Sequence, residues 1–287
     1  MASKISKLIA DAMKMYQVDR FDTEILLAHA LKKPREWVVS NPDFFVPWIE
    51  DFKFQKMVKK RGAGVPVAYL TGHKEFFGFD FIVNKDTLIP RPDTETLVED
   101  AIKTIQKIND KKVLLIDVGT GSGCIPISIA KTFKNTNSQI HLEVEATDIS
   151  KKALAIAKQN ARKHFVEINF FDGNLLQPFL DKKIDLSGKE IFITANLPYL
   201  KEEQFESEPS IQHEPHSALV AEDNGLALYK ELLDQMQKSS VPFTAYFEID
   251  PSQKDTLPEY IRPLFPEAQI EIIKDLCGRE RIIKMKI

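Results

Sequence analysis

The amino-acid sequence predicts an α/β fold: a mostly parallel seven-stranded sheet with an antiparallel edge hairpin, preceded by a small helical domain and a β-hairpin linker. Three observations support this prediction. Apolar residues recur at helical spacing in the first segment, an aromatic run surrounds Gly78, and strand-like and helix-like stretches alternate after Lys112. We therefore expect a helical domain over 1–75, a hairpin linker over 76–90 and an α/β domain over 91–287.

Composition excludes several classes of protein. The chain has 287 residues, of which 43% are hydrophobic and 28% charged, so it can bury a core and is not disordered, collagenous or coiled-coil as a whole. No apolar run reaches the ~18 residues of a membrane-spanning helix, and we expect no signal peptide. Because Cys124 and Cys277 are the only cysteines, we expect no disulfide scaffold and a cytoplasmic location.

Charge argues against a wide nucleic-acid surface. The net charge is −3, with a mildly basic first segment followed by an acidic remainder. A protein that grips nucleic acid carries a concentrated basic face, which this distribution does not provide. We therefore expect neither a nucleic-acid partner nor a membrane, and we expect a monomer.

The elements follow from hydrophobic periodicity and turn residues. Two prolines make 89–93 extended and place a helix start at Asp93 or Thr94. The predicted strands are 113–118, 140–147, 166–171, 190–195, 243–249, 268–274 and 280–286. The predicted helices of this part are 123–133, 150–164, 225–238 and 252–264. Since only 275–279 separate the last two strands, these form an antiparallel hairpin.

A glycine-rich turn follows the first of these strands. It comprises Gly119, Thr120, Gly121, Ser122 and Gly123. Glycines allow the backbone to turn sharply and lie against a ligand, and the following helix offers free N–H groups. Asp148 ends the next strand, where a carboxylate can accept hydrogen bonds from ribose hydroxyls.

Two cofactors fit this arrangement. A dinucleotide fingerprint would need glycine or alanine at Cys124, which weakens the case for NAD. Glycines at 119, 121 and 123 after Asp117 have the spacing typical of S-adenosylmethionine (SAM) binding. The alternatives are a glycine-rich connection without a ligand, and Asp148 acting only as a helix cap.

A second motif, Asn196-Leu197-Pro198-Tyr199, ends a later buried strand. Its chemistry suits methylation of a planar NH2: the Asn196 side-chain oxygen accepts one N–H and the Leu197 carbonyl accepts the other. Tyr199 can stack on the flat substrate, and Pro198 stiffens the backbone. We predict Asn196, Pro198 and Tyr199 as catalytic residues; the alternative is an ordinary exit from a strand.

With both motifs in place, the chain resembles the HemK/PrmC family, which methylates the glutamine side-chain amide in the Gly-Gly-Gln motif of peptide-chain release factors. The resemblance rests on several ordered segments. They are 64–72 with Phe76, 88–95 (LIPRPDTE), 214–219, 224–229, 248–253 and 275–281. It implies a helical domain that contacts the release factor and a Rossmann-like SAM-dependent methyltransferase domain.

The resemblance also implies site residues and cofactor. SAM would contact the 119–123 turn, Asp148, Leu175 and Asn196, and the substrate glutamine would contact Asn196, Leu197, Pro198 and Tyr199. The product would be S-adenosylhomocysteine. His213 and His216 flank Glu214, but without a third spaced ligand we expect no metal.

Three positions depart from the family pattern. Leu197 replaces the usual first proline of the tetrapeptide, Asn174 stands where an acid is favoured, and Asp250 replaces a usual glycine. Because adenine-N6 methyltransferases of ribosomal RNA also carry Asn-Leu-Pro-Tyr, methylation of adenine in RNA or DNA is the alternative function. A domain that binds SAM or a release factor without turnover is the third hypothesis.

Overall fold

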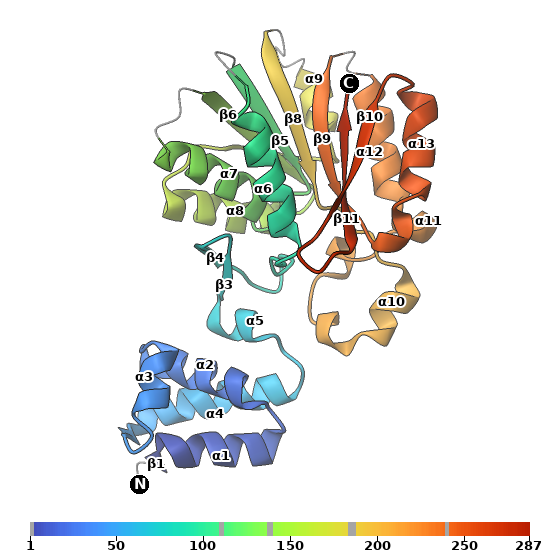
Figure 1. Cartoon of the computed structure of the whole chain (residues 1–287). Coiled ribbons are helices and arrows are strands. Elements are labelled where there is room, and N and C mark those ends of the chain that lie inside the picture. Colours follow the sequence, from blue (N-terminus) through green and yellow to red (C-terminus); the bar gives the residue numbers. More distant parts are fainter. Residues whose placement is uncertain (1–2, 109–111, 137–139, 183–187, 239–240) are drawn as a thin grey trace. The chain divides into compact units, whose positions relative to one another are not determined.

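The computed structural model describes residues 3–108, 112–136, 140–182, 188–238 and 241–287 (Figure 1). The chain forms two compact units. One contains Met1–His73 with Glu208–His213, and the other contains Lys74–Ser207 with Glu214–Ile287. The first two residues of the predicted 1–75 segment lie outside the described residues. In the described part of the chain, each helix falls short of the length and apolar character that crossing a bilayer requires.

The first unit is a helical bundle with two short paired strands. Its elements are β1 (Ser3–Lys4), α1 (Ile5–Tyr16), α2 (Arg20–Leu31), α3 (Arg35–Ser40), β2 (Phe45–Val46), α4 (Trp48–Gly62) and α5 (Val67–Thr71). The core is formed by the apolar faces of α1, α2 and α4. Glu24 is buried within α2, and it is compensated by Arg20 and Arg35, each 2.7 Å from a carboxylate oxygen.

A β-hairpin follows, formed by β3 (His73–Phe76) and β4 (Phe79–Ile82). Its two-residue turn, Phe77-Gly78, has positive φ at both positions, 52° and 74°. This turn geometry matches the right-handed twist of paired strands. The aromatic run therefore forms a hairpin, as predicted, but the first strand begins at His73 rather than Phe76.

The second unit contains a seven-stranded sheet in the order β10-β11-β9-β8-β5-β6-β7. Its strands are β5 (Lys112–Val118), β6 (His141–Asp148), β7 (Asn169–Asp172), β8 (Lys189–Ala195), β9 (Phe243–Glu248), β10 (Gln269–Lys274) and β11 (Glu280–Lys286). The pairings from β7 to β9 are parallel, and β11 is antiparallel to both β9 and β10. The predicted sheet with its antiparallel edge hairpin is confirmed.

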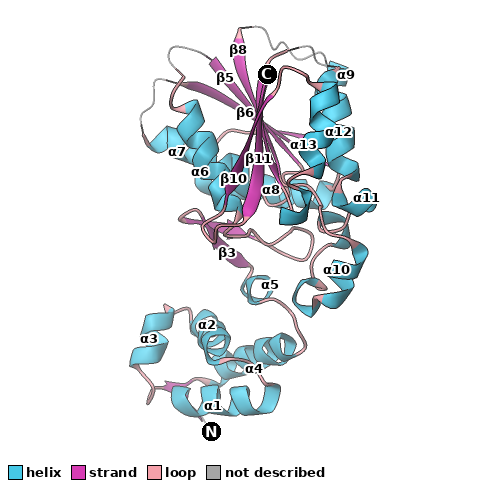
Figure 2. Cartoon of the chain, turned by 45° about the vertical axis from the view of Figure 1, so that its right-hand side comes forward, coloured by secondary structure: helices cyan, strands magenta, loops and turns pink. Residues whose placement is uncertain are grey.

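Helices cover both faces of this sheet (Figures 1 and 2). The longer ones are α6 (Thr94–Ile105), α7 (Cys124–Asn135), α8 (Lys151–His164), α12 (Ala227–Gln237) and α13 (Thr256–Leu264). The shorter ones are α9 (Gln177–Lys182), α10 (Glu202–Ser207) and α11 (Glu222–Gly225). Successive β5 residues alternate between two core clusters: Leu114 and Ile116 face α12 and α13, whereas Val113 and Leu115 face α6 and α7.

One row of paired residues determines where the loops leave the sheet. Thr147, Val118, Ala195 and Phe247 lie side by side on four neighbouring strands. The residue after each of them is therefore at the same carboxyl edge. These residues are Asp148, Gly119, Asn196 and Glu248.

Asn160 of α8 joins the hairpin to the glycine-rich turn. Its Oδ1 accepts the Ile82 N–H at 2.8 Å, and its Nδ2 lies 2.9 Å from both the Ile82 and Ser122 carbonyl oxygens. The side chain is fully buried. Asn160 thus pairs three backbone groups, two of the hairpin and one of the glycine-rich turn.

Asn160→Leu should lower the free energy of unfolding by about 2–4 kcal/mol, because it leaves three backbone groups unpaired around a fully buried side chain. Urea denaturation measures the change. Gln159→Leu, at an exposed neighbouring position of the same helix, is the matched control and should change stability little. Equal stability of the two variants would contradict the bridging role.

Candidate functional site

A cavity of about 330 Å³ lies at the carboxyl edge of the sheet. Both predicted motifs line it. Their contributing residues are Gly119, Thr120, Gly121, Ser122, Asp148, Leu175, Asn196, Leu197 and Pro198. Gly123 and Tyr199 do not belong to the lining of this cavity. The two turns therefore share one cavity, which is the arrangement that methyl transfer between them requires.

The glycine-rich turn is held by β6. The N–H groups of Gly119 and Thr120 donate to the Thr147 carbonyl at 3.0 and 2.9 Å. A Cβ built on Gly121 would meet no protein atom within 4 Å, so this backbone borders open space. Gly123 instead packs closely against α7 and α8, where a Cβ would lie 2.9 Å from Ile127.

Asp148 supports the same turn. Its two carboxylate oxygens accept the N–H groups of Gly121 and Ser150, each at 2.8 Å. Burial raises the pKa of Asp148, while the backbone hydrogen bonds from Ser150 and Gly121 lower it. Ser150, not Asp148, caps α8, since its hydroxyl accepts the Ala153 N–H at 3.2 Å. Asp148 is therefore not the N-cap of α8.

Asp117 lies beneath the turn and is fully buried within β5. Its Oδ1 accepts the Thr194 hydroxyl at 2.6 Å. Among the described residues, Oδ2 of Asp117 and the hydroxyl of Thr120 lack hydrogen-bond partners. Burial raises the pKa of Asp117 to about 7, partly offset by the hydrogen bond from Thr194.

Another part of the cavity wall is the turn at 173–175, which hydrogen bonds to α12 hold in place. Leu175 has a φ of 50°, which is uncommon for a residue with a side chain. Asn174 Nδ2 donates to Glu231 Oε1 at 2.5 Å, and the Leu176 N–H donates to Gln235 Oε1 at 2.8 Å. Since a carboxylate only accepts, Asn174 must present its NH2 to Glu231.

Two hydrogen bonds orient the start of the Asn196–Tyr199 turn. Asn196 Nδ2 donates to the Thr94 hydroxyl at 3.2 Å, and the Leu197 N–H donates to the Tyr229 hydroxyl at 3.2 Å. Within the described residues, Oδ1 of Asn196 and the carbonyl of Leu197 accept no hydrogen bond. These two oxygens are the acceptors that the sequence predicted.

Tyr199 is held at both of its polar ends. Its hydroxyl donates to Glu248 Oε1 at 3.2 Å, and its carbonyl accepts the Gln253 Nε2 at 3.3 Å. Burial raises the pKa of the Tyr199 hydroxyl, so it remains protonated. A Cβ on Gly225 would lie 1.9 Å from the Tyr199 carbonyl oxygen, which explains glycine at that position.

Glu214 joins two segments of the cavity wall. Its carboxylate accepts the Ile89 N–H at 3.0 Å and pairs with Arg91 at 2.5 Å. Both Arg91 and the neighbouring Pro215 line the cavity. His216 lies 2.9 Å from Glu202, and the described residues contain no cluster able to hold a metal ion.

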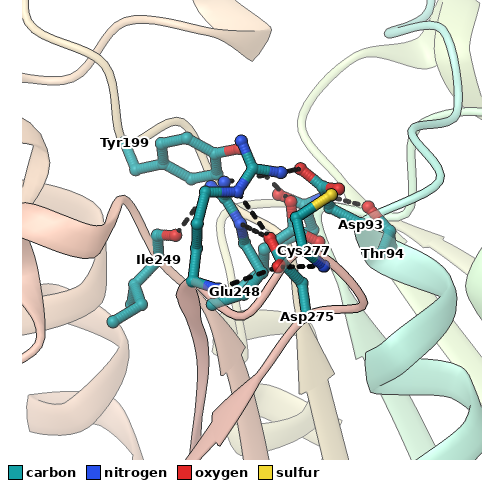
Figure 3. Close-up of polar contacts among 10 residues, drawn as sticks. Asp93, Thr94, Tyr199, Glu248, Ile249, Asp275 and Cys277 are labelled. Atoms are coloured by element: carbon teal, nitrogen blue, oxygen red, sulfur yellow. Dashed lines mark hydrogen bonds and ion pairs between the residues drawn. The ribbon is translucent and has the colours of Figure 1, made fainter.

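Sequence reasoning did not identify a polar network beside Tyr199 (Figure 3). Asp93 lies 2.8 Å from Arg279 and 3.4 Å from Arg281, and Arg281 donates to the Ile249 carbonyl at 3.1 Å. The buried Asp275 accepts backbone N–H groups of the hairpin turn. The network attaches the β10–β11 turn to the start of α6 and the end of β9.

Comparison with known proteins follows the same division. The PrmC N-terminal domain matches residues 6–72, and the methyltransferase small domain matches residues 94–206. A release factor glutamine methyltransferase of Bacillus subtilis is 36% identical over 91% of this chain and 88% of its own length. One of Bacillus anthracis is 32% identical over 92% and 91%, and one of Enterococcus faecalis is 40% identical over 76% and 74%.

The chain belongs to the release factor glutamine methyltransferase family. The predicted family, its enzyme class and its cofactor SAM are thereby confirmed. Among solved structures, the N-terminal domain of human METTL16 in complex with SAH has a TM-score of 0.50 over 91% of this chain and 92% of its own, at 17% identity. That similarity confirms the fold.

Asp117 gives this family member a testable pH dependence. Since its folded-state pKa lies above the unfolded value, the folded chain holds a proton that the unfolded chain has lost, and stability falls as pH rises from about 4 to 7. Asp117→Asn should therefore gain stability relative to wild type across this range, by up to roughly 4 kcal/mol.

Urea denaturation at several pH values measures this difference. Asp255→Asn makes the same charge change at an exposed position and should show little such trend. If the difference in free energy of unfolding between wild type and Asp117→Asn stays constant with pH, a raised pKa at Asp117 is refuted.

Proposed function

We propose that this chain transfers a methyl group from SAM to the side-chain amide nitrogen of the glutamine in the Gly-Gly-Gln motif of a peptide-chain release factor. The observation that carries this proposal is the shared cavity, in which two unpaired acceptors of Asn196 and Leu197 lie with the glycine-rich turn. The names of the curated relatives support the substrate. S-adenosylhomocysteine is the second product.

The cavity fits SAM. The bare backbone at Gly121 leaves space for its amino-acid end, and Asp148 ends β6 where ribose hydroxyls can donate to it. Leu175 supplies an apolar wall. Asn174, with its NH2 engaged by Glu231, has its Oδ1 left as an acceptor for an exocyclic adenine amine.

SAM supplies an electrophilic methyl group on a sulfonium sulfur, and the protein positions the nitrogen that attacks it. An amide nitrogen is weakly nucleophilic because its lone pair is delocalised into the carbonyl. Asn196 Oδ1 and the Leu197 carbonyl each accept one N–H, which fixes the nitrogen and favours loss of a proton as positive charge develops. The leaving sulfur keeps the electron pair of the broken carbon–sulfur bond.

Pro198 and Tyr199 complete the proposed substrate contacts. Proline restricts Leu197 to extended geometry, so its carbonyl keeps one direction. Tyr199 would stack on the glutamine amide, although in this structure its hydroxyl engages Glu248 and its ring does not line the cavity. We also propose that the helical segment 1–75 contacts the release factor. The monomeric state and the cytoplasmic location remain predictions.

Mass spectrometry tests the substrate. The protein is incubated with SAM and a bacterial release factor, and the tryptic peptides are sequenced. We expect one added methyl group on the Gly-Gly-Gln glutamine, and none on a release factor with alanine at that glutamine. A parallel reaction contains an adenine-bearing RNA, and methylation of the RNA alone would instead support the adenine-N6 alternative.

Asp148→Ala should weaken SAM binding by about 1–3 kcal/mol, because it removes a charged acceptor and releases the Gly121 N–H. Isothermal titration measures the affinity. Asp172→Ala, at the matching end of β7 and outside the cavity, is the control and should bind SAM almost as wild type does. Unchanged affinity in Asp148→Ala would remove Asp148 from the cofactor site.

Asn196→Ala should reduce kcat about a hundredfold or more while changing SAM affinity far less, because the lost acceptor acts on the substrate nitrogen. Steady-state methylation and SAM titration give the two quantities. Asn135→Ala, at an exposed end of α7, controls for general effects. Equal losses of turnover and SAM affinity would contradict this role of Asn196.

A further inference from the structure

Tyr229 lies behind the turn that carries the two proposed acceptors. It belongs to the first turn of α12, is fully buried and does not line the cavity. Its ring packs edge-on against Phe247 of β9, with the ring centroids 5.7 Å apart. The proposed mechanism assigns it no role, yet a hydroxyl group buried in this way costs stability unless its hydrogen bonds are made.

The hydroxyl of Tyr229 connects this turn to the sheet. It accepts the Leu197 N–H at 3.2 Å, and it donates to the Glu248 carbonyl at the end of β9. Because an N–H can only donate and a carbonyl can only accept, chemistry determines the direction of both bonds. Burial raises the pKa of this hydroxyl, so it keeps its hydrogen. The Leu197 N–H is therefore held by a group that is itself held by a strand.

The direction of the Leu197 carbonyl, the second proposed acceptor, depends on this bond. Pro198 restricts the ψ angle of Leu197 to extended values, which fixes the carbonyl relative to the rest of that residue. It does not fix the peptide group between 196 and 197, whose N–H points at Tyr229. Leucine, unlike proline, has no ring that limits its φ angle. The bond to Tyr229 supplies a restraint on the side of Leu197 that Pro198 does not reach.

We propose that Tyr229 is a positioning residue, whose hydroxyl sets the direction in which the Leu197 carbonyl faces the cavity. A displaced carbonyl would leave one N–H of the substrate amide without its acceptor, so the nitrogen would be held at one point instead of two. SAM is proposed to be held by the glycine-rich turn and Asp148, so its affinity should depend little on Tyr229. The inference rests on the proposed function in naming the substrate amide.

The first test removes one hydroxyl. Tyr229→Phe keeps the ring, and we expect kcat to fall roughly ten- to hundredfold with SAM affinity changed less than about threefold. Tyr246→Phe is the matched control, because Tyr246 is as buried, donates to the Thr104 hydroxyl at 2.8 Å and belongs to the core on the other face of the sheet. It should lose stability in urea but keep its kcat. If kcat of Tyr229→Phe is within about fivefold of that of Tyr246→Phe, the inference is overturned.

The second test removes the other partner of the bond. Leucic acid, the hydroxy-acid analogue of leucine, is incorporated at 197, which replaces the Leu197 N–H by an ester oxygen and leaves Tyr229 intact. We expect a loss of kcat similar to that of Tyr229→Phe, and little further loss when the two changes are combined, because both remove one interaction. An ester variant with wild-type kcat, or losses that multiply in the combined variant, would contradict the inference.

The third test does not depend on methyl transfer. In nuclear magnetic resonance of protein with 15N-labelled leucine, the backbone signal of Leu197 is the one missing from Leu197→Met. We expect its proton shift to move upfield in Tyr229→Phe, as for an amide that loses its acceptor, and to stay in place in Tyr246→Phe. An unmoved signal in Tyr229→Phe, or an equal shift in both variants, refutes the bond. If wild type fails to methylate glutamine, the proposed function falls, while this signal still decides whether Tyr229 holds Leu197.

Discussion

The register of the parallel sheet is the constraint on which the site depends. Thr147, Val118, Ala195 and Phe247 are paired across β6, β5, β8 and β9, so the next residue of each strand emerges at one level. Neighbouring strands are about 4.8 Å apart, which brings Asp148, Gly119 and Asn196 into reach of one ligand. A slip by one residue would turn each strand's side chains to the opposite face, so the buried core on both faces also protects the site geometry.

The carboxyl edge of the sheet holds acidic residues that would cost less free energy of folding at exposed positions. Burial is the largest cause of the raised pKa at Asp117, Asp148 and Glu248. The low-dielectric surroundings that penalise these charges also strengthen the hydrogen bonds they accept. The buried acids therefore cost free energy of folding, but they fix the directions of hydroxyl and amide groups. Burial of the two hydrophobic clusters of the sheet offsets that cost.

Much of the fold could be predicted because its signals are local. Buried runs of β-branched residues define the strands within a few residues, and the short 275–279 connection requires a hairpin. The short helices α9 and α10 escaped prediction because six residues cannot display helical periodicity. The inclusion of Glu208–His213 in the first unit also leaves no periodic signal in the sequence.

The candidate site likewise contains residues that could be predicted from the sequence and residues that could not. Gly119, Gly121 and Asn196 could be predicted because a turn against a ligand and a conjugated amine each demand particular residue types. The contacts of Thr94 with Asn196 and of Glu248 with Tyr199 could not, because they arise only when β9 and the start of α6 are placed beside β8. A threonine at a helix start and a glutamate at a strand end are ordinary in sequence.

Packing and a hydrogen bond hold the backbone at Leu197, where the family pattern has a proline ring. Its side chain is buried, with one methyl 2.8 Å from the position of a Cβ on Gly119, so it joins the two turns through packing. Its N–H donates to Tyr229, a bond that proline cannot make. A proline ring fixes the backbone through covalent geometry, whereas here the hydrogen bond to Tyr229 and the contact with Gly119 restrict the same peptide. The acceptor needed for chemistry is the Leu197 carbonyl, which does not change with the side chain, so this position can vary as long as its backbone stays held.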